Sequence, residues 1–410
     1  MSDSMRIRCI STSYPSYVGD ASGNFVASLN QVFQNYDWHV EVIGPQKPAE
    51  AEPPSCEHYI GFKTFGGPFG KEGAPDWLMR HPIVGYCWAP WVTTALWYSI
   101  WSRDRKSNST VTIAHWLLPT GLCALSSHPI IYAHGGDVAL LERIPWGRAI
   151  ASLIARRARG IIFVSEDLKQ RFLNLCIDPP KFVFTCSMGV EKSQRYDPQN
   201  RQKWRKISAG RYIIVTVGRL TLIKGYHLLA EAILSLPLEI RSQICWIAGG
   251  EGPQKERLKE YQTLGVPLIL SGYLTPDARD PLLQVADIFV QPSQRLGKRV
   301  EGSPVALMEA LVAGCAVIGS NSGGIPAQLY DAQSRLTQAF ERSTQVPSTR
   351  YLVFDTGDYM DLARCIQQLL KQGEELAKHR NIAEEAHELI TWKHKGVEHM
   401  ELINQIVHKA

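Results

Sequence analysis

The sequence lacks several features that would place it in other protein classes. No apolar run approaches the ~20 residues of a membrane span, and the start, M-S-D-S-M-R-I-R, lacks the apolar segment of a signal peptide. The nine cysteines are odd in number and scattered without a C-x-x-C pair, which argues against a disulfide framework and a zinc site. No D-x-D lies near a predicted strand end, which argues against a metal-bound diphosphate. We therefore expect a cytoplasmic protein with reduced cysteines and no bound metal.

The length and charge of the chain limit its organisation and its partners. The chain has 410 residues, which is long for one core and comfortable for two domains. Its net charge of +5 fits acidic ligands or an anionic membrane surface, but it is too small to imply nucleic acid. The polar stretch 191–210 has no apolar run, so we predict a linker there.

The stretch 286–326 predicts a strand, a helix and a second strand. The strands are expected at 287–291 and 316–318, where short apolar runs occur. Three residues signal the ends of the helix between them: Ser303 as its cap, Pro304 at its first position and Gly314 just past its end. A unit of this kind places ligands at the carboxyl ends of its strands, where the helix begins.

Two glutamates in this unit, Glu301 before the helix and Glu309 inside it, are candidate ligand residues. The helix reads V-A-L-M-E-A-L-V-A, so a carboxylate on it is costly unless donors meet it. Glu309 either occupies a thin solvated stripe, pairs with an arginine or accepts from ligand hydroxyls, and burial alone does not decide. Glu301 favours the ligand, because the N–H groups of a helix start attract an anion. A phosphate there, between two carboxylates that accept from hydroxyls, suits a nucleotide sugar, and the predicted contacts at the helix start are Gly302, Ser303, Pro304 and Val305.

The segment E-G-S-P-V-A-L-M-E, with Q-P-S before it and S-G-G-I-P after it, resembles the E-x7-E signature of retaining glycosyltransferases with the two-domain B-type fold, family four in particular. The resemblance implies that Glu301 meets hydroxyls of the donor sugar and that Glu309 holds the ribose of the nucleotide. The family often has a glutamate directly after G-G-I-P. This chain has Ala327 there, which puts an acid role at that position in question.

The segment G-R-L-T-L-I-K-G follows the strand predicted at 212–217. Arg219 and Lys224 lie five apart around a strand-to-helix turn and can both reach one diphosphate, the arginine as a fork and the lysine as a point charge. Alone, they would be surface charges. The G-R-x4-K-G pattern, which begins at Gly218, resembles the diphosphate clamp of the family. The resemblance also implies that the nucleotide base packs near Tyr273 and Leu274.

In the first half, His115 and His134 lie at the carboxyl ends of predicted parallel strands, which is the ligand edge of an open sheet. For His115 we favour a structural role. The segment A-H-G-G-D-V resembles the H-G-x-D segment of the family, whose histidine lies beside the donor sugar, so His134 is a candidate catalytic residue. Asp137 either orients it or caps the next helix.

A glycine loop, Y-P-S-Y-V-G-D-A-S-G, separates the first predicted strand from a helix that ends near Asn35. In this layout backbone N–H groups can approach a phosphate. Gly19 and Gly23 either shape a tight turn or, as the resemblance implies, lie beneath the diphosphate or the acceptor. Gly19 is the candidate contact.

An apolar segment, 82–101, contains tryptophans at a spacing compatible with a helix that has a broad aromatic face. Most such stripes belong to the core, and we predict the same here. An acceptor groove or a membrane-facing patch is the alternative, and the basic residues from Arg103 onward slightly favour the membrane-facing patch. The tryptophans are Trp88, Trp91, Trp97 and Trp101.

The expected fold is α/β, with two Rossmann-like domains facing across a cleft. We predict an acceptor-binding domain at 1–190, the linker, a nucleotide-sugar-binding domain at 211–391, and a terminal helix, 392–410, that the resemblance places back on the first domain. The implied reaction is retaining, metal-independent transfer of a hexosyl group from a nucleoside-diphosphate sugar, preferably a UDP-sugar. The acceptor would be a saccharide, a lipid or a small metabolite. The residues predicted to be catalytic are His134, Arg219, Lys224 and Glu301.

Two other functions stay open. A phosphorylase of the same fold would use free phosphate in place of the acceptor, and it would have no ribose for Glu309 to hold. A nucleotide-sugar-binding protein without turnover would keep the site and lack the reaction. We expect no cofactor beyond the nucleotide-sugar co-substrate, and a peripheral contact with the inner face of the membrane stays open.

Overall fold

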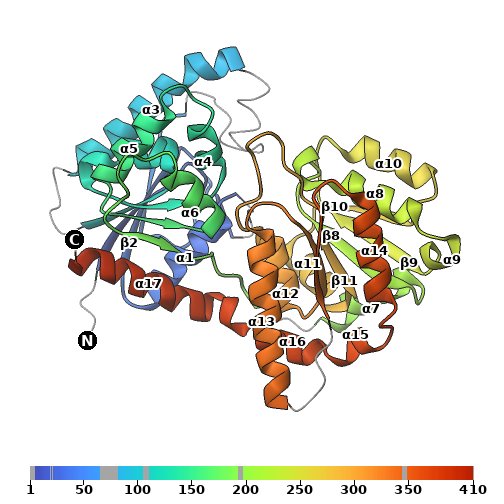
Figure 1. The fold of residues 1–410 in the computed structure, drawn as a ribbon. Coiled ribbons are helices and arrows are strands. Elements are labelled where there is room, and N and C mark those ends of the chain that lie inside the picture. Colours follow the sequence, from blue (N-terminus) through green and yellow to red (C-terminus); the bar gives the residue numbers. More distant parts are fainter. Residues whose placement is uncertain are drawn as a thin grey trace. The chain divides into compact units, whose positions relative to one another are not determined.

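The computed structural model describes residues 5–18, 20, 22–64, 82–104, 110–192, 197–343 and 349–409. The chain forms two compact units, one from Met1–Gly189 together with Trp392–Ala410 and one from Val190–Thr391. Each unit contains one parallel sheet with helices packed on it (Figure 1). The prediction of two Rossmann-like α/β domains is confirmed.

The first unit contains a seven-stranded sheet in the order β3-β2-β1-β4-β5-β6-β7. Its strands read as nearly continuous apolar runs, because helices cover both faces of such a sheet. The strands are β1 Arg6–Ile10, β2 His39–Pro45, β3 His58–Phe62, β4 Thr110–His115, β5 Ile130–Ala133, β6 Gly160–Phe163 and β7 Val183–Thr185. The helices are α1 Asn24–Asn35, α3 Pro82–Asp104, η1 Leu117–Gly121, η2 Leu125–Ser127, α4 Gly136–Leu141, α5 Gly147–Arg157, α6 Glu166–Leu173 and α17 Trp392–Lys409.

The second unit contains a six-stranded sheet in the order β10-β9-β8-β11-β12-β13. The order reverses between β8 and β11, and ligands of open parallel sheets bind outside the strand ends at such a point. The strands are β8 Tyr212–Val217, β9 Ile244–Gly249, β10 Leu268–Gly272, β11 Ile288–Gln291, β12 Ala316–Ser320 and β13 Tyr351–Phe354. The helices are α7 Pro198–Ser208, η3 Leu222–Lys224, α8 Tyr226–Ser235, α9 Leu238–Arg241, α10 Lys255–Thr263, α11 Pro276–Val285, α12 Val305–Val312, α13 Ile325–Ser343, α14 Tyr359–Leu370, α15 Glu375–Lys378, α16 Arg380–Ala386 and η4 Glu388–Ile390.

The stretch 191–210, predicted as a linker, contains the helix α7 and belongs to the second unit. Asp197 caps this helix, since its carboxylate accepts from the backbone N–H groups of Gln199 and Asn200. Trp204 is buried in the core of the unit. Only a narrow stripe of this helix is buried, so its sequence is mostly polar. Because the segment contains no apolar run, the sequence did not predict a helix there.

The last helix, α17, belongs to the first unit and packs against α1. Gly396 permits the close approach of the two helices, because a Cβ there would lie 2.4 Å from a methyl group of Val32. Ile403 and Ile406 are fully buried, and a Cβ on Gly160 of β6 would lie 2.9 Å from Ile406. The helix α17 and the strand β1 therefore contribute side chains to the same hydrophobic core.

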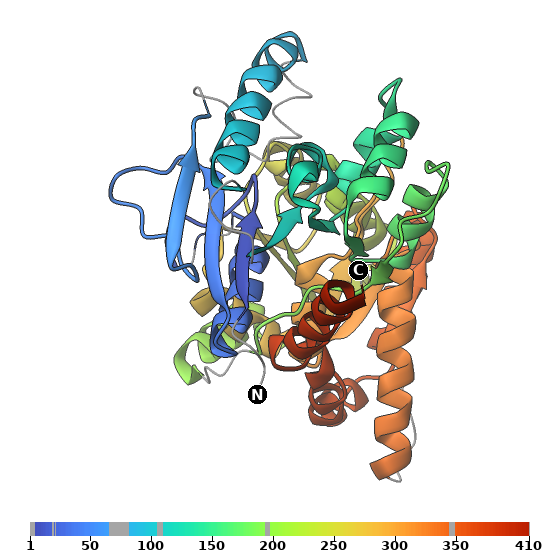
Figure 2. The same ribbon diagram turned by 90° about the vertical axis from the view of Figure 1, so that its left-hand side faces the viewer.

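The helix α3 contacts β3 and lies beside the strands of the first unit (Figure 2). Among the described side chains of this helix, Val92, Leu96 and Ile100 are buried, whereas Trp91 is 67% exposed and Trp97 is 44% exposed. The core interpretation is therefore wrong for these two tryptophans, since the three aliphatic side chains occupy the buried face. The side chain of Trp88 lies outside the described residues.

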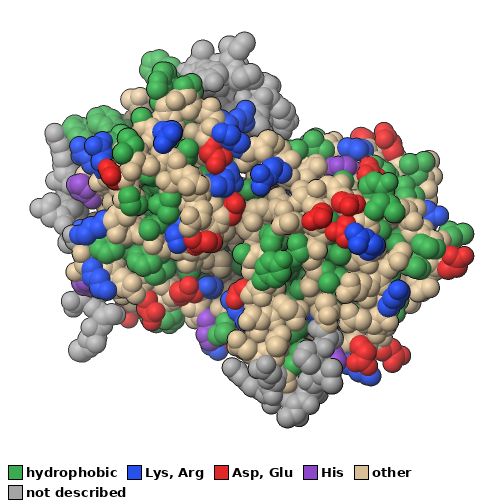
Figure 3. Space-filling model, viewed as in Figure 1, with side chains coloured by type: hydrophobic (Ala, Val, Ile, Leu, Met, Phe, Trp, Pro, Cys, Tyr) green, Lys and Arg blue, Asp and Glu red, His purple; other side chains and the backbone are tan. Residues whose placement is uncertain are grey.

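The surface carries both signs of charge on each unit (Figure 3), in keeping with the small net charge. Among the helices that the structure describes, none combines the length and the hydropathy that crossing a bilayer requires.

Candidate functional site

The loop after β8 forms one side of the candidate donor site. Gly218 has a φ of +148°, and Gly225, directly after η3, has a φ of +68°. A Cβ on Gly225 would lie 1.8 Å from the carbonyl oxygen of Pro292, so only glycine fits where this loop crosses the loop after β11. This contact fixes Lys224, at the end of η3, beside the carboxyl end of β11.

Gln294 joins the same two loops by hydrogen bonds. Its backbone N–H donates to the carbonyl of Ile223 at 2.8 Å, and its side-chain amide donates to the carbonyl of Leu222 at 2.7 Å. The turn that holds Lys224 is thus tied to the segment that leads to Glu301.

Lys224 and Glu301, both predicted from the sequence, are in contact. Nζ of Lys224 lies 3.1 Å from Oε1 of Glu301. The backbone carbonyl of Glu301 accepts from the N–H of Gly324 at 3.1 Å. Gly323 has a φ of +57°, and a Cβ there would lie 2.0 Å from that carbonyl oxygen. The loops after β8, β11 and β12 therefore meet at Glu301, at the edge of the sheet where a ligand is expected.

The start of α12 differs from the prediction. The helix begins at Val305, and Pro304, not Ser303, occupies the cap position without a side-chain hydrogen bond. The hydroxyl of Ser303 accepts instead from the side-chain amide of Gln328 on α13 at 2.7 Å. The cap prediction is wrong because a partner from a distant part of the sequence engages that hydroxyl. Gly302 precedes Ser303 in the same segment, so the predicted contacts at the helix start remain together.

Glu309 pairs with an arginine that the sequence analysis did not identify. Nη1 of Arg279, on α11, lies 2.9 Å from Oε1 of Glu309. Burial raises the pKa of Glu309 to about 7, against the opposing effect of the Arg279 guanidinium. The same guanidinium donates from Nε and Nη2 to Oδ1 of Asp280, at 3.0 and 2.9 Å. Of the interpretations left open for Glu309, pairing with an arginine is therefore present, and contact with a ribose remains a proposal.

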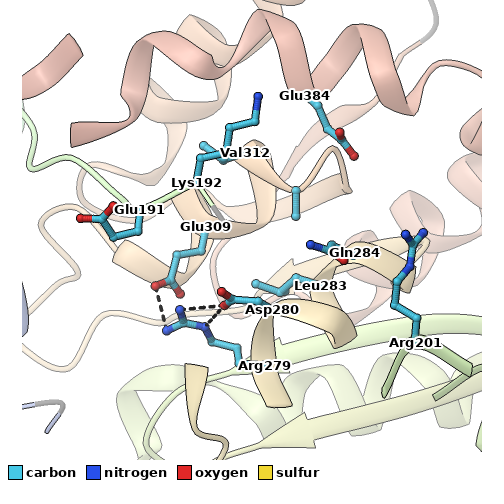
Figure 4. A pocket seen from close by; sticks show the side chains of 11 residues that line it. Glu191, Lys192, Arg201, Arg279, Asp280, Leu283, Gln284, Glu309, Val312 and Glu384 are labelled. Atoms are coloured by element: carbon cyan, nitrogen blue, oxygen red, sulfur yellow. Dashed lines mark hydrogen bonds and ion pairs between the residues drawn. The ribbon is translucent and has the colours of Figure 1, made fainter. Parts of the chain in front are cut away.

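Glu309 and Arg279 point toward each other beside a cavity of about 220 Å³ (Figure 4). The cavity lies within the second unit and is lined mostly by polar side chains from α7, α11, α12 and α16. These include Arg201, Arg279, Asp280, Gln284, Glu309 and Glu384.

Tyr273 and Leu274 directly follow β10 at the same edge of the sheet. Tyr273 is 57% exposed, so one face of its ring is open to a partner. Leu274 packs against β9, since a Cβ on Gly249 would lie 2.4 Å from its side chain. The structure thus brings the predicted base contacts to the edge that carries Glu301.

Tyr226, at the start of α8, is a further residue that the sequence analysis missed. Tyr226 is buried. Its hydroxyl lies beside the loop that carries Arg219 and Lys224, 3.2 Å from where a Cβ on Gly218 would lie. Burial, and then the charge of Glu301, raises the pKa of the Tyr226 phenol, so the hydroxyl keeps its proton and can donate. Its position directly after the G-R-x4-K-G motif is the sequence feature that could have identified it as a candidate site residue.

In the first unit, His134 follows β5 and lies against His115. Nε2 of His134 is 3.1 Å from Nδ1 of His115, and the ring of Phe25 lies 4.8 Å from that of His134. Burial lowers the pKa of His134 to about 3 and, together with His134, lowers the pKa of His115. Both imidazoles are therefore neutral at neutral pH. His115 is fully buried, as its predicted structural role requires.

Asp137 lies in the first turn of α4, and Gly135 occupies the cap position without a side-chain hydrogen bond, so the cap prediction is wrong. Its carboxylate accepts from the backbone N–H groups of Gly135, Val138 and Leu117, at 2.9, 3.0 and 2.8 Å. It therefore ties the loop after β5 to the turn after β4, which fixes the backbone on either side of the histidine pair.

Of the two glycines in the glycine loop, Gly19 lies outside the described residues. Gly23 has a φ of +68° at the start of α1, and a Cβ there would lie 2.1 Å from the carbonyl oxygen of Ser13. For Gly23 the tight-turn interpretation is therefore sufficient.

Metal-ligating side chains do not gather in the part of the chain that the structure describes. Within those residues, no group of three or more histidine, cysteine, aspartate or glutamate side chains is placed to hold a metal ion.

Comparisons with known proteins identify relatives. Residues 198–388 match the sequence profile of glycosyl transferases group 1. A GDP-mannose-dependent alpha-(1-6)-phosphatidylinositol monomannoside mannosyltransferase from Mycobacterium tuberculosis is 29% identical over 260 residues, which cover 61% of this chain and 66% of that protein. The match thus spans slightly less than two thirds of the relative.

Solved structures show the same fold at low sequence identity. Sucrose-phosphate synthase from Thermosynechococcus elongatus superposes with a TM-score of 0.72 at 17% identity, covering 99% of this chain and all of that one. Alr3699/HepE from Anabaena, solved in complex with UDP, superposes with a TM-score of 0.69 at 15% identity, covering 98% of this chain and all of that one.

Proposed function

We propose that this chain is a glycosyltransferase, because residues 198–388 match the sequence profile of glycosyl transferases group 1. In this proposal it moves a hexosyl group from a nucleoside-diphosphate sugar to an acceptor hydroxyl, with retention and without a metal ion. The observation that carries the proposal is the contact of Lys224 with Glu301, 3.1 Å apart. It brings a phosphate-binding cation and a hydroxyl-binding carboxylate to one point of the ligand edge.

The reaction breaks the bond between the anomeric carbon and the diphosphate oxygen, and it forms a bond to the acceptor oxygen. Negative charge develops on the leaving diphosphate, and preorganised positive charge is the effective way to stabilise it. We assign this to Arg219, Lys224 and the N–H groups at the start of α12. The acceptor proton passes to the leaving phosphate oxygen, so the step needs no side-chain base.

The sugar gains positive character as its bond to the diphosphate breaks. We assign Glu301 to hydroxyls of the sugar, and we retain His134 of the first unit as a sugar contact. Because His134 is neutral at neutral pH, it would act as a hydrogen-bonding partner and not as a charge. This division keeps the positively charged side chains for the diphosphate.

The base and ribose define the donor class. We propose that Glu309 holds the ribose and that the base stacks on Tyr273 beside Leu274. The relatives do not select one base, since the mannosyltransferase is described as GDP-mannose-dependent and HepE was solved with UDP. UDP-sugars are our preferred donors, and GDP-sugars are the direct alternative.

A donor panel tests the proposal. UDP-, GDP- and ADP-sugars are incubated with the full chain, and release of the nucleoside diphosphate is measured with and without added saccharide or lipid acceptors. We expect slow release from one nucleotide class in water. Release of a sugar phosphate from a glycoside with inorganic phosphate, and none from nucleotide sugars, would instead identify a phosphorylase. Tight binding without release under any condition would identify a binding protein.

The acceptor remains the broadest part of the proposal. The exposed Trp91 and Trp97 on α3 are suited to a sugar ring or to the interfacial region of a membrane. We propose that α3 contributes to acceptor selection, and substitution of both tryptophans by serine tests this. We expect a higher acceptor KM with little change in slow donor hydrolysis.

A further inference from the structure

Arg279 joins two carboxylates on neighbouring helices. It lies in the first turn of α11, and its Nη1 reaches Oε1 of Glu309 on α12 at 2.9 Å. Its Nε and Nη2 both donate to Oδ1 of the adjacent Asp280. All three side chains are at least three-quarters buried, so these contacts are shielded from water and depend strongly on geometry.

The planar guanidinium makes the arrangement directional. One edge of it, Nε with Nη2, is engaged by Asp280, which leaves Nη1 aimed at Glu309. A lysine has one point charge and cannot hold both carboxylates in a fixed relative orientation. Asp280 therefore orients Arg279, and Arg279 in turn sets the direction of the Glu309 carboxylate.

One oxygen of Glu309 has a defined partner: Oε1 lies 2.9 Å from Nη1 of Arg279. Glu309 lines the cavity of about 220 Å³, which leaves room beside its carboxylate. A carboxylate oriented through one oxygen beside a cavity can present its second oxygen to a ligand hydroxyl and accept one directed hydrogen bond from it.

We propose that Arg279, oriented by Asp280, is a positioning residue of the donor site: it holds Oε1 of Glu309 so that Oε2 accepts a hydrogen bond from a ribose hydroxyl. This role rests on the proposed function, because it requires a ribose at Glu309. It gives the arginine no direct contact with the sugar or the diphosphate. Its effect on binding should therefore depend on the ribose diol.

Calorimetric titration tests the role with two pairs of ligands, UDP and GDP and their 2′,3′-dideoxy forms. The variants are Arg279→Gln, Arg279→Lys and Asp280→Asn. Arg257→Gln is the matched control. Arg257 is an exposed arginine on α10 that also lies near a carboxylate, 3.9 Å from Glu231, and neither residue belongs to α11 or α12. Arg279→Lys keeps the positive charge and Asp280→Asn keeps the side-chain shape. The test therefore does not depend on the folding of Arg279→Gln alone.

We expect Arg279→Gln to weaken binding of the ribose nucleotide about tenfold and binding of its dideoxy form less than twofold. Arg279→Lys and Asp280→Asn should show smaller losses with the same dependence on the diol, and the control none. Equal losses for both forms would overturn the role, because they indicate general structural damage. Tighter binding of the ribose form would also overturn it, because Arg279 would then compete with the ribose. Failure of the unsubstituted chain to bind any nucleoside diphosphate would overturn the proposed function, and this role with it.

Discussion

The ammonium group of Lys224 lies 3.1 Å from a carboxylate oxygen of Glu301, although the two residues come from loops after different strands. In the proposed function the lysine binds a diphosphate and the glutamate binds a sugar. Their pairing keeps each from being an unpaired, partly buried charge when the donor is absent. In this proposal, binding of a nucleoside-diphosphate sugar replaces the Lys224–Glu301 contact with two others, one from Lys224 to the diphosphate and one from Glu301 to the sugar.

Arg219→Ala should lower turnover more than donor affinity. The guanidinium is assigned to charge that grows on the diphosphate during bond cleavage, so its loss acts on the transition state. We expect kcat to fall about a hundredfold and the donor KM to change by a few fold. Steady-state kinetics with the donor identified by the panel measures both, with Arg257→Ala as the control. An unchanged kcat with a large rise in KM would contradict the assignment.

Donor affinity should depend on the protonation of Glu309. Burial raises the pKa of Glu309 to about 7, so the carboxylate gains a proton as the pH falls through 7 and accepts from the ribose less well. We expect the Kd for a nucleotide sugar to rise by up to about tenfold per pH unit below 7 and to be flat above 8. The diphosphate diester of a nucleotide sugar does not titrate in this range.

Glu309→Gln provides the control for that pH dependence. The variant should bind the donor more weakly at pH 8 and with an affinity that no longer changes between pH 6 and 8. Calorimetric titration at each pH measures this. A slope that persists in Glu309→Gln would show that another group titrates.

His134 should not produce a limb in the pH–rate profile between pH 5 and 9. Burial lowers the pKa of His134 to about 3, so the ring is neutral throughout this range. His134→Ala should nevertheless reduce release of the nucleoside diphosphate from its sugar about a hundredfold, and His134→Gln should retain part of the activity. Initial rates across the pH range check this, and a limb near 6.5 that disappears in both variants would refute the neutral role.

Gly323→Ala should destabilise the second unit. The position has a φ of +57°, and the new Cβ would lie 2.0 Å from the carbonyl oxygen of Glu301, so strain and a steric clash add. Gly357→Ala is the matched control, with a φ of +88° and nothing within 4 Å of the new Cβ. We expect the control to cost about 1 kcal/mol of unfolding free energy and Gly323→Ala about 3 kcal/mol or more. Urea unfolding measures both, and equal costs would refute the steric argument.

Much of the fold follows from the sequence because the buried strands of parallel sheets are continuous apolar runs. The runs that became β8, β11 and β12 were predicted within a residue or two of their ends. The strand β3 and the helix α7 were not predicted. β3 lies at the sheet edge with only Phe62 buried, and α7 buries little more than Trp204.

The site was predictable where residues close in sequence share a loop, and less so where helices supply the partner. Lys224 and Glu301 each belong to a short motif, and the sheet order then brings them together. Arg279 was missed because its relation to Glu309 exists only once α11 and α12 pack side by side, and no spacing along the chain encodes that distance. Gln328 was missed as the partner of Ser303 for the same reason.

The chain enters and leaves the second unit at adjacent points, where Val190 donates to the carbonyl of Ile390 and forms a bridge with Thr391. Gly189 and Trp392, the flanking residues of the first unit, are also close, since a Cβ on Gly189 would lie 2.7 Å from the ring of Trp392. The second unit is in this sense an insertion whose two ends nearly coincide. Excising 190–391 and fusing the flanking residues would keep all seven strands of the first sheet and the helix α17 in one chain, so we expect that each unit can be produced alone and its ligands assigned without the other.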